Sequence, residues 1–278
     1  MRNEFLAHGV KQVYHVAGTG PVCVAHSGGP GIGSGYLRAP GLEEHFTMVY
    51  LEPVGTGDSG RLETYDMATY VRFLSAVVDH LGEREVTVLG HSYGGFVALQ
   101  YALQHPDRVA GLALYDTSPL TGPDFFAAAL AGLAEYPARY PDVHGAAAVP
   151  AAFQQAITAT DDETLTAALR AAIPVYFADY WARRAEFRRF TENVRAWAAP
   201  ASAQDPVPYD VTPRLREISA PTAVVAGAHD FICGPRWARM LADGIPGARL
   251  TVLEDSGHFG HVEQPAEFAE AVVSALLR

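Results

Sequence analysis

The sequence predicts an α/β fold: a mostly parallel, doubly wound sheet covered by helices, with a helical cap inserted after the sixth strand. Three observations support this prediction. Short, nearly continuous apolar runs recur along the chain, as in strands that are buried on both faces of a parallel sheet. Helical patterns separate most of these runs, as in βαβ units. One long stretch, residues 119–213, contains no convincing strand and breaks the alternation.

The strands are expected to begin with a hairpin near the start of the chain. The alternating segment Val10–Val16 indicates a strand, and we expect it to pair with Phe5–His8. The apolar runs that follow predict the remaining strands, which are Val22–Ala25, Met48–Leu51, Val86–Leu89, Val109–Leu114, Thr222–Ala226 and Leu250–Leu253.

Four helices of the core are recognised by their ends or their position. Asp66 is expected to cap the first of them, and Gly82 is expected to end it. A second helix is expected over Tyr93–Gln104, directly after an apolar run. Pro235 begins a third, because proline is favoured in the first turn of a helix. The last helix begins around Pro265.

The stretch without strands is too long to be a simple loop in a compact domain. It holds helical patterns rich in alanine and aromatic residues, with prolines between them. We therefore expect residues 119–213 to form a helical cap. Residues 1–118 and 214–278 are expected to form the core that carries the sheet.

Composition limits the partners of the protein. The 278 residues carry a formal net charge of −11, which disfavours binding to the phosphate backbone of nucleic acid. The N-terminal segment lacks the apolar core of a signal peptide, and no apolar run is long enough to span a bilayer. The two cysteines do not indicate a disulfide framework. We expect a cytoplasmic protein that needs no metal or other cofactor and binds neither nucleic acid nor membrane.

The most specific motif is the pentapeptide G-H-S-Y-G at residues 90–94, a G-x-S-x-G pattern. It follows an expected strand and opens an expected helix. In this context the pattern predicts a nucleophile elbow, a strained turn that exposes a serine hydroxyl at the N-terminus of a helix. Gly90 and Gly94 are small enough to flank such a turn. We therefore predict that Ser92 is a catalytic nucleophile.

A serine nucleophile needs a base, and the base needs an acid that orients it. His258 lies between the last expected strand and the last helix, and we predict that it is the base. Asp230, just after the strand Thr222–Ala226, is the predicted acid. Asp255 and Asp116 are the rival acids and rank below it.

Catalysis by such a triad also needs hydrogen-bond donors for the oxyanion of the tetrahedral intermediate. One expected donor is the backbone N–H of Tyr93, the residue after the nucleophile. The other is expected from the loop after the third strand, residues 26–31 (H-S-G-G-P-G), where glycines let the backbone approach a substrate closely.

Together these motifs resemble the α/β-hydrolases, and among them the proline iminopeptidases (prolyl aminopeptidases). That family carries H-G-G-P-G after its third strand, and residues 28–31 match the last four positions, with Ser27 in place of the histidine. Its loop D-x-x-G-x-G-x-S is similar to residues 52–59, with Glu52 in place of aspartate. Its pattern G-x-x-D-x-x-C-x-P is similar to residues 227–235.

The resemblance covers most of the core and does not extend to the cap. It implies that Gly29 is the second oxyanion donor and that Glu52 has a structural role. The nucleophile motif differs, because iminopeptidases tend to have G-G-S-W-G where this chain has G-H-S-Y-G, a form that is general among esterases and other hydrolases.

The resemblance also implies that an acidic cap residue recognises the free amine of a substrate. We expect Trp181–Trp197 to form a cap helix in which Glu186 shares a stripe with Phe190. An inward Glu186 carboxylate would pair with a substrate ammonium. In the alternative, which is about equally supported, Glu186 pairs with Arg183, Arg184 or Arg189 on the same helix.

These observations predict a serine hydrolase that acts through an acyl-enzyme on a small molecule, short peptide or amide. The first hypothesis is an aminopeptidase or aminoacyl amidase that releases a small N-terminal residue. The second is a carboxylesterase, lactonase or thioesterase that acts on a small apolar acyl substrate. The third, from a different class, is a non-catalytic ligand binder, although binding alone does not require Ser, Asp and His together.

Overall fold

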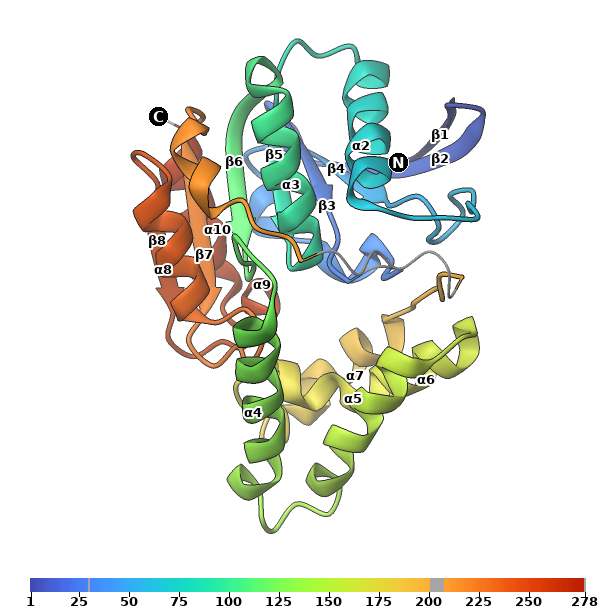
Figure 1. Cartoon of the computed structure of the whole chain (residues 1–278), viewed down its shortest axis with the longest axis vertical. Coiled ribbons are helices and arrows are strands. Elements are labelled where there is room, and N and C mark those ends of the chain that lie inside the picture. The colour runs from blue at the N-terminus through green and yellow to red at the C-terminus, as the bar shows by residue number, and fades with distance from the viewer. Residues whose placement is uncertain (30, 201–207, 278) are drawn as a thin grey trace.

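The computed structural model describes residues 1–29, 31–200 and 208–277, and these contain an eight-stranded sheet with the order β1-β2-β4-β3-β5-β6-β7-β8 (Figure 1). The strands are β1 Arg2–Ala7, β2 Val10–Ala17, β3 Val22–His26, β4 Thr47–Glu52, β5 Val86–His91, β6 Val109–Tyr115, β7 Thr222–Gly227 and β8 Arg249–Leu253. Strands β3 to β8 are parallel, whereas β2 is antiparallel to both of its neighbours, β1 and β4. The predicted strands, the hairpin and the mostly parallel sheet are confirmed.

Helices cover both faces of the sheet. The helices outside the segment between β6 and β7 are α1 Pro40–Glu43, α2 Met67–Leu81, α3 Tyr93–Gln104, α8 Pro235–Gly244, α9 Gly260–Glu263 and α10 Pro265–Leu276. Buried side chains of α2, α3 and α8 belong to one hydrophobic cluster, and those of α1 and α10 belong to another. Strand residues belong to both clusters. This is expected of a doubly wound sheet, because each face of the sheet packs against its own layer of helices.

Local sequence signals fix the ends of α2. The Asp66 side chain accepts a hydrogen bond from the Thr69 backbone N–H at 2.7 Å, which satisfies one of the free donors of the first turn. Gly82 has φ 73°, a left-handed conformation that glycine adopts without strain, and it ends the helix. Both predicted caps are confirmed.

The segment between β6 and β7 is helical and lies beyond the carboxyl ends of the strands (Figure 1). Its helices are α4 Pro123–Arg139, α5 Val149–Thr158, α6 Asp162–Ala172 and α7 Arg184–Asn193. We call this helical segment the cap. The exact boundaries of the cap, predicted at residues 119 and 213, remain a prediction. Residue 213 lies within the 3₁₀ helix η6, Thr212–Glu217.

The predicted cap helix Trp181–Trp197 is wrong at both ends, since α7 spans only Arg184–Asn193. The chain leaves the helix at Val194, which has ψ 128°. It then runs beside the glycine-rich loop, where Ala196 forms a β-bridge with Ile32 and the Trp197 N–H donates to the Gly31 carbonyl at 2.7 Å. These residues are far apart in the sequence. Their pairing keeps residues 194–197 extended, so the helix does not continue.

The two ends of the cap segment meet at the edge of the core. The Thr121 N–H donates to the Tyr209 carbonyl at 2.7 Å, and the Val211 N–H donates to the Pro119 carbonyl at 2.9 Å. In the part of the chain that the structure describes, no helix has the length and apolar character needed to cross a membrane.

Candidate active site

Ser92 occupies the turn between β5 and α3. Its φ of 54° and ψ of −120° are strained for a residue with a side chain. Two hydrogen bonds hold this conformation: the Ser92 N–H donates to the Tyr115 carbonyl at 3.0 Å, and the Thr117 hydroxyl donates to the Ser92 carbonyl at 2.8 Å. The geometry is that of the predicted nucleophile elbow, with the serine hydroxyl above the end of the sheet.

The glycines around Ser92 are needed for close backbone contacts. A Cβ at Gly90 would overlap the carbonyl oxygen of Gly94, and a Cβ at Gly94 would overlap that of His26. A Cβ at Gly95 would overlap the Thr117 side chain. The helix α3 can therefore begin directly at the end of β5 only because these positions lack side chains.

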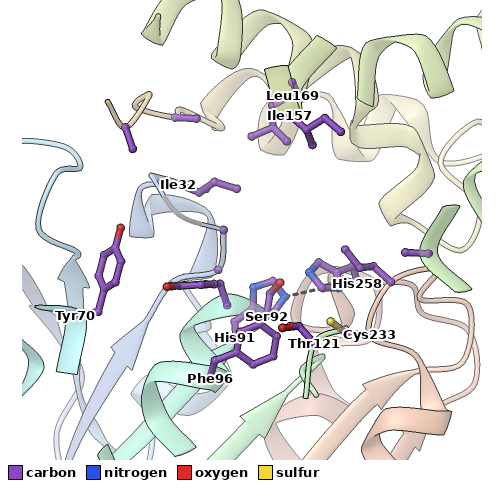
Figure 2. Close-up of a pocket in the computed structure, with 18 of the residues that line it drawn as sticks. Ile32, Tyr70, His91, Ser92, Phe96, Thr121, Ile157, Leu169, Cys233 and His258 are labelled. Carbon is purple, nitrogen blue, oxygen red and sulfur yellow. Dashed lines mark hydrogen bonds between the residues drawn. The ribbon is translucent and has the colours of Figure 1, made fainter. Parts of the chain in front are cut away.

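His258 and Asp230 form a buried pair. His258 Nδ1 lies 2.7 Å from Asp230 Oδ2, and the two residues are only 3% and 8% exposed. The carboxylate oxygen accepts this hydrogen bond, so Nδ1 carries the proton and Nε2 is the other ring nitrogen. Ser92 and His258 both line one cavity beneath the cap (Figure 2). The structure thus brings the three predicted triad residues to one site.

The rival carboxylates lie differently. Asp255 is exposed to solvent. Asp116 is fully buried near the pair, with Oδ1 accepting the Gly227 N–H at 2.8 Å and Oδ2 without a hydrogen-bond partner among the described residues. Burial and, secondarily, the charge of Asp230 raise the pKa of Asp116 well above its usual value. Of the three carboxylates, Asp230 is therefore the one hydrogen-bonded to His258, and burial favours the protonated form of Asp116 by raising its pKa.

A chain of hydrogen bonds joins the glycine-rich loop, the nucleophile turn and the His258 loop. His91 Nε2 lies 2.9 Å from the His258 carbonyl, so Nε2 must carry a proton. Burial, with a smaller effect of His258, holds the pKa of His91 well below its usual value, so its Nδ1 is an acceptor. The Tyr36 hydroxyl donates to this Nδ1 at 2.6 Å and accepts the Gly28 N–H at 2.7 Å. We call Tyr36 and His91 the clamp.

His261 extends the same network and has a structural position. Its Nε2 donates to the Tyr36 carbonyl at 2.8 Å, and its Nδ1 accepts from the Tyr115 hydroxyl at 2.9 Å. Burial lowers the pKa of His261 to about 4, so the ring is neutral. Neither nitrogen is left for a substrate.

One group of buried side chains, His91, Asp116 and His258, has potential metal-ligand atoms within 4.8 Å of one another among the described residues. Its histidines are already engaged, because both ring nitrogens of His91 and the Nδ1 of His258 hold protein partners. The donor set therefore fits a hydrogen-bond network better than a metal site.

The predicted oxyanion donors belong to the same cavity wall as Ser92. Gly29 and Tyr93 both line the cavity. Gly29 has φ 60°, a left-handed conformation, and a Cβ there would lie 2.5 Å from Ile32 Cδ1. The N–H of the neighbouring Gly28 is already donated to Tyr36, which leaves Gly29 as the candidate donor of this loop. Pro30 of the motif lies outside the described residues.

The cavity above Ser92 is large, about 1080 Å³, and mostly apolar. Its walls come from the core and from α4, α5 and α6 of the cap. Among the described residues that line it, Asp66 is the sole acidic side chain, and none is lysine or arginine. Asp66 is already engaged as the cap of α2.

The expectation that Glu186 faces the substrate is wrong. Its side chain is 54% exposed and forms an ion pair with Arg183 at 2.6 Å. Glu186 does not belong to the described lining of the cavity. The two side chains are neighbours because they lie three residues apart at the start of α7. The pair lies outside the cavity and is solvated. The alternative pairing stated from the sequence is the one observed.

Sequence reasoning gave no role to either clamp residue. His91 stood inside the quoted motif, but the motif allows any residue at that position. Tyr36 had no signal, because its partners are remote in the sequence and meet only when the loops converge on the sheet.

Comparisons with known proteins show which family the chain belongs to. A family model described as "alpha/beta hydrolase fold" matches residues 21–265. A 2-hydroxy-6-oxononadienedioate/2-hydroxy-6-oxononatrienedioate hydrolase of Klebsiella pneumoniae is 29% identical, over 92% of this chain and 87% of the relative. The proline iminopeptidase PfmaB of Pestalotiopsis fici is 24% identical, over 92% of each chain. The crystal structure of a Pseudomonas aeruginosa hydrolase is 25% identical, with a TM-score of 0.75 over 100% of this chain and 98% of its own.

Proposed function

Because the chain belongs to the α/β-hydrolase fold family, we propose that this hydrolase is a serine esterase that cleaves an uncharged, apolar carboxylic ester. Ser92 is the nucleophile of this proposal, His258 the base and Asp230 the carboxylate that orients it. The reaction passes through an acyl-enzyme on Ser92.

In the first half-reaction, His258 Nε2 takes the proton of the Ser92 hydroxyl as its oxygen attacks the ester carbonyl. Asp230 accepts the Nδ1 hydrogen bond and stabilises the imidazolium that forms. The backbone N–H groups of Gly29 and Tyr93 stabilise the oxyanion. When the intermediate collapses, the C–O bond to the alcohol breaks and His258 returns the proton to the leaving oxygen.

In the second half-reaction, water replaces the alcohol. His258 takes a proton from the water as its oxygen attacks the acyl carbon, and the new oxyanion lies at the same two N–H groups. Collapse breaks the bond to the Ser92 oxygen, which regains its proton from His258. The carboxylic acid leaves and the site is restored.

The observation that carries the ester proposal is the chemistry of the cavity wall. An aminopeptidase needs a carboxylate for the substrate ammonium, and among the described residues that line the cavity the one acidic residue, Asp66, already caps α2. Substrates such as the dienedioates in the name of the Klebsiella relative carry carboxylates, and the described lining has no lysine or arginine to pair with them. A neutral, apolar ester requires neither partner.

The test compares three substrates and two variants. We expect the protein to hydrolyse p-nitrophenyl butyrate, and to hydrolyse prolyl p-nitroanilide no faster than its N-acetylated form. Ser92→Ala should lower kcat for the ester by roughly 10⁵-fold or more, as in other serine hydrolases that lose the nucleophile. Ser219→Ala, at an exposed serine outside the cavity, is the matched control and should leave kcat unchanged.

A strong preference for the free amine would instead establish the aminopeptidase function predicted from the sequence. Ester hydrolysis that survives Ser92→Ala would remove Ser92 from the mechanism.

A further inference from the structure

Exposed apolar side chains are concentrated at the edge of the active-site cavity. The large hydrophobic residues that are exposed in the described chain are Met1, Leu6, Phe126, Leu130 and Ile157. Phe126 and Leu130 on α4 and Ile157 on α5 are 56%, 49% and 56% exposed, and they also line the cavity that contains Ser92. We call these three residues the rim.

The apolar surface is continuous from the rim toward the serine. Inside the rim the cavity is lined by residues of the cap that carry no charge, namely Phe125, Ala129, Phe153, Ala156, Leu165 and Leu169. Figure 2 shows Ile157 and Leu169 on the cap side of the cavity, opposite Ser92 and His258. An apolar group held near Ser92 would therefore find apolar surface as it extends toward the rim.

Outside the rim, the apolar surface continues between α4 and α5. A second hollow of about 350 Å³ there is lined by Leu130, Leu133, Ala134, Pro150, Ala151 and Gln154. Leu130 belongs to both spaces, so the hollow adjoins the active-site cavity.

The cavity is much larger than a small ester needs. Pockets of about 300 to 1000 Å³ enclose most of a drug-sized ligand, and this cavity is about 1080 Å³. A short acyl group would leave much apolar wall in contact with water, whereas a long chain would remove it from water. Exposed apolar residues at the end of the same wall indicate that the ligand also covers the rim.

We propose that the substrate has a long, uncharged acyl chain, which extends from Ser92 beneath the cap and leaves the cavity at Phe126, Leu130 and Ile157. This inference rests on the proposed esterase function and names the substrate class of that site. The rim is then a specificity element for chain length, and the hollow between α4 and α5 receives the end of the longest chains.

The test is a chain-length series of p-nitrophenyl esters from acetate to dodecanoate, measured below and above the critical micelle concentration. We expect kcat/KM to rise by up to about fourfold for each added methylene, the equivalent of about 0.8 kcal/mol, until the chain reaches the rim. Leu130→Glu and Ile157→Glu, each at an exposed position of a different helix, should lower kcat/KM for decanoate about tenfold more than for acetate. Thermal unfolding at the temperature of the parent protein shows that the variants are folded.

Leu6→Glu is the matched control, because Leu6 is 73% exposed on β1 and does not line the cavity. It should change kcat/KM for neither ester.

A kcat/KM that stays flat or falls with chain length overturns the inference, while turnover of acetate leaves the esterase proposal in place. Equal losses for acetate and decanoate also overturn it. So does a rim effect that appears only above the critical micelle concentration, which would assign the rim to a lipid surface. Absence of turnover for every ester overturns both proposals.

Discussion

The Tyr36 hydroxyl connects two loops whose relative position matters for catalysis. It holds the N–H of Gly28, next to the candidate oxyanion donor Gly29, and it donates to His91, next to Ser92. His91 in turn holds the carbonyl of His258. Since neither clamp side chain is the base or the nucleophile, the clamp acts by positioning these groups.

Tyr36→Phe tests this role with little loss of packing. Two hydrogen bonds disappear, each with a net contribution of about 0.5 to 1.5 kcal/mol, so kcat for a good ester should fall roughly 10- to 100-fold. KM should change little, because the ring and the apolar wall remain. Steady-state kinetics give both values, and burst kinetics show whether acylation is the slowed step.

Tyr65→Phe is the control for this variant. Tyr65 lines the same cavity, but its hydroxyl accepts the Leu62 N–H, away from the triad. Its loss should leave kcat within a few-fold of the parent value. Equal losses of kcat in both variants would contradict a specific positioning role for Tyr36.

Asp116 offers a prediction about pH and stability. Its raised pKa means that the folded protein keeps it protonated at pH values where the unfolded chain ionises it. Its contribution to stability is therefore greatest at low pH and decreases as the pH rises above the unfolded value near 3.8. Asp116→Asn imitates the protonated acid, because it carries no charge and its amide oxygen can accept the Gly227 N–H.

We expect Asp116→Asn to raise the free energy of unfolding at pH 8 by roughly 1 to 3 kcal/mol, because the amide takes up no proton on folding and a shift of one pKa unit corresponds to about 1.4 kcal/mol. The gain should shrink toward pH 5. Urea unfolding at several pH values measures both quantities. A variant that is less stable than the parent at pH 8, or a gain that grows as the pH falls, would show that Asp116 is ionised in the folded protein.

At the scale of elements, the distance between α3 and the segment after β6 depends on one missing side chain. A Cβ at Gly95 would overlap the Thr117 side chain, whose hydroxyl holds the Ser92 carbonyl. Gly95→Ala should therefore lower the free energy of unfolding by about 1 to 3 kcal/mol, as overpacking of a core does. It should also lower kcat, because Thr117 must move. Thermal unfolding and ester kinetics measure the two effects.

Gly122→Ala is the control for steric overlap. No atom lies within 4 Å of a Cβ built there, and its φ of 166° is extended backbone that any residue adopts. This variant should be as stable as the parent. If Gly95→Ala were equally harmless, the contact between α3 and Thr117 would not set the position of the nucleophile turn.

Elements that depend on local signals could be predicted, and elements that depend on remote partners could not. Residues next to each helix were enough to predict the caps of α2 at Asp66 and Gly82 and the span of α3 after β5. The predicted cap helix was too long because Ala196 pairs with Ile32, a residue far away in the sequence. Helical periodicity contains no information about that bridge.

At the scale of the whole molecule, the cap and the core share buried side chains. One hydrophobic cluster contains Ala113 on β6 together with Leu169, Ile173 and Phe187 of the cap. The cap therefore shares part of its core with the sheet, and a smaller cluster of Leu133, Tyr136, Ala146, Val149 and Val175 lies within the cap itself. We expect the protein to unfold in one cooperative transition in urea, although the chain is longer than most two-state proteins.

Tryptophans provide probes of both parts. Trp181 in the cap donates to the Tyr136 hydroxyl at 2.9 Å, and Trp237 is buried on α8 of the core. In two variants that each retain one of these residues, with the other tryptophans replaced by phenylalanine, the fluorescence midpoints should coincide. A midpoint for Trp181 that falls at clearly lower urea concentration would mean that the cap unfolds separately.

The candidate site was predictable where a motif and its order along the chain define it. The order of Ser92, Asp230 and His258 predicted residues that the fold does bring to one site. The character of the cavity was not predictable, because its wall combines cap and core residues whose spacing in sequence has no regular pattern. Glu186 is an example. Helical periodicity predicted which residues share a face with it on α7, but which face of α7 meets the cavity depends on how the whole cap packs.

The meeting of the two ends of the cap segment has an evolutionary consequence. Thr121 is bonded to Tyr209 and Val211 to Pro119, so the path of β6 and β7 does not depend on how much chain lies between these points. The entropy of closing such a loop grows only with the logarithm of its length. Insertions, deletions or exchange of helices within the segment can therefore be tolerated without moving the sheet. Selection can remodel the range of molecules that the protein accepts while the reacting groups stay under separate, stricter constraint.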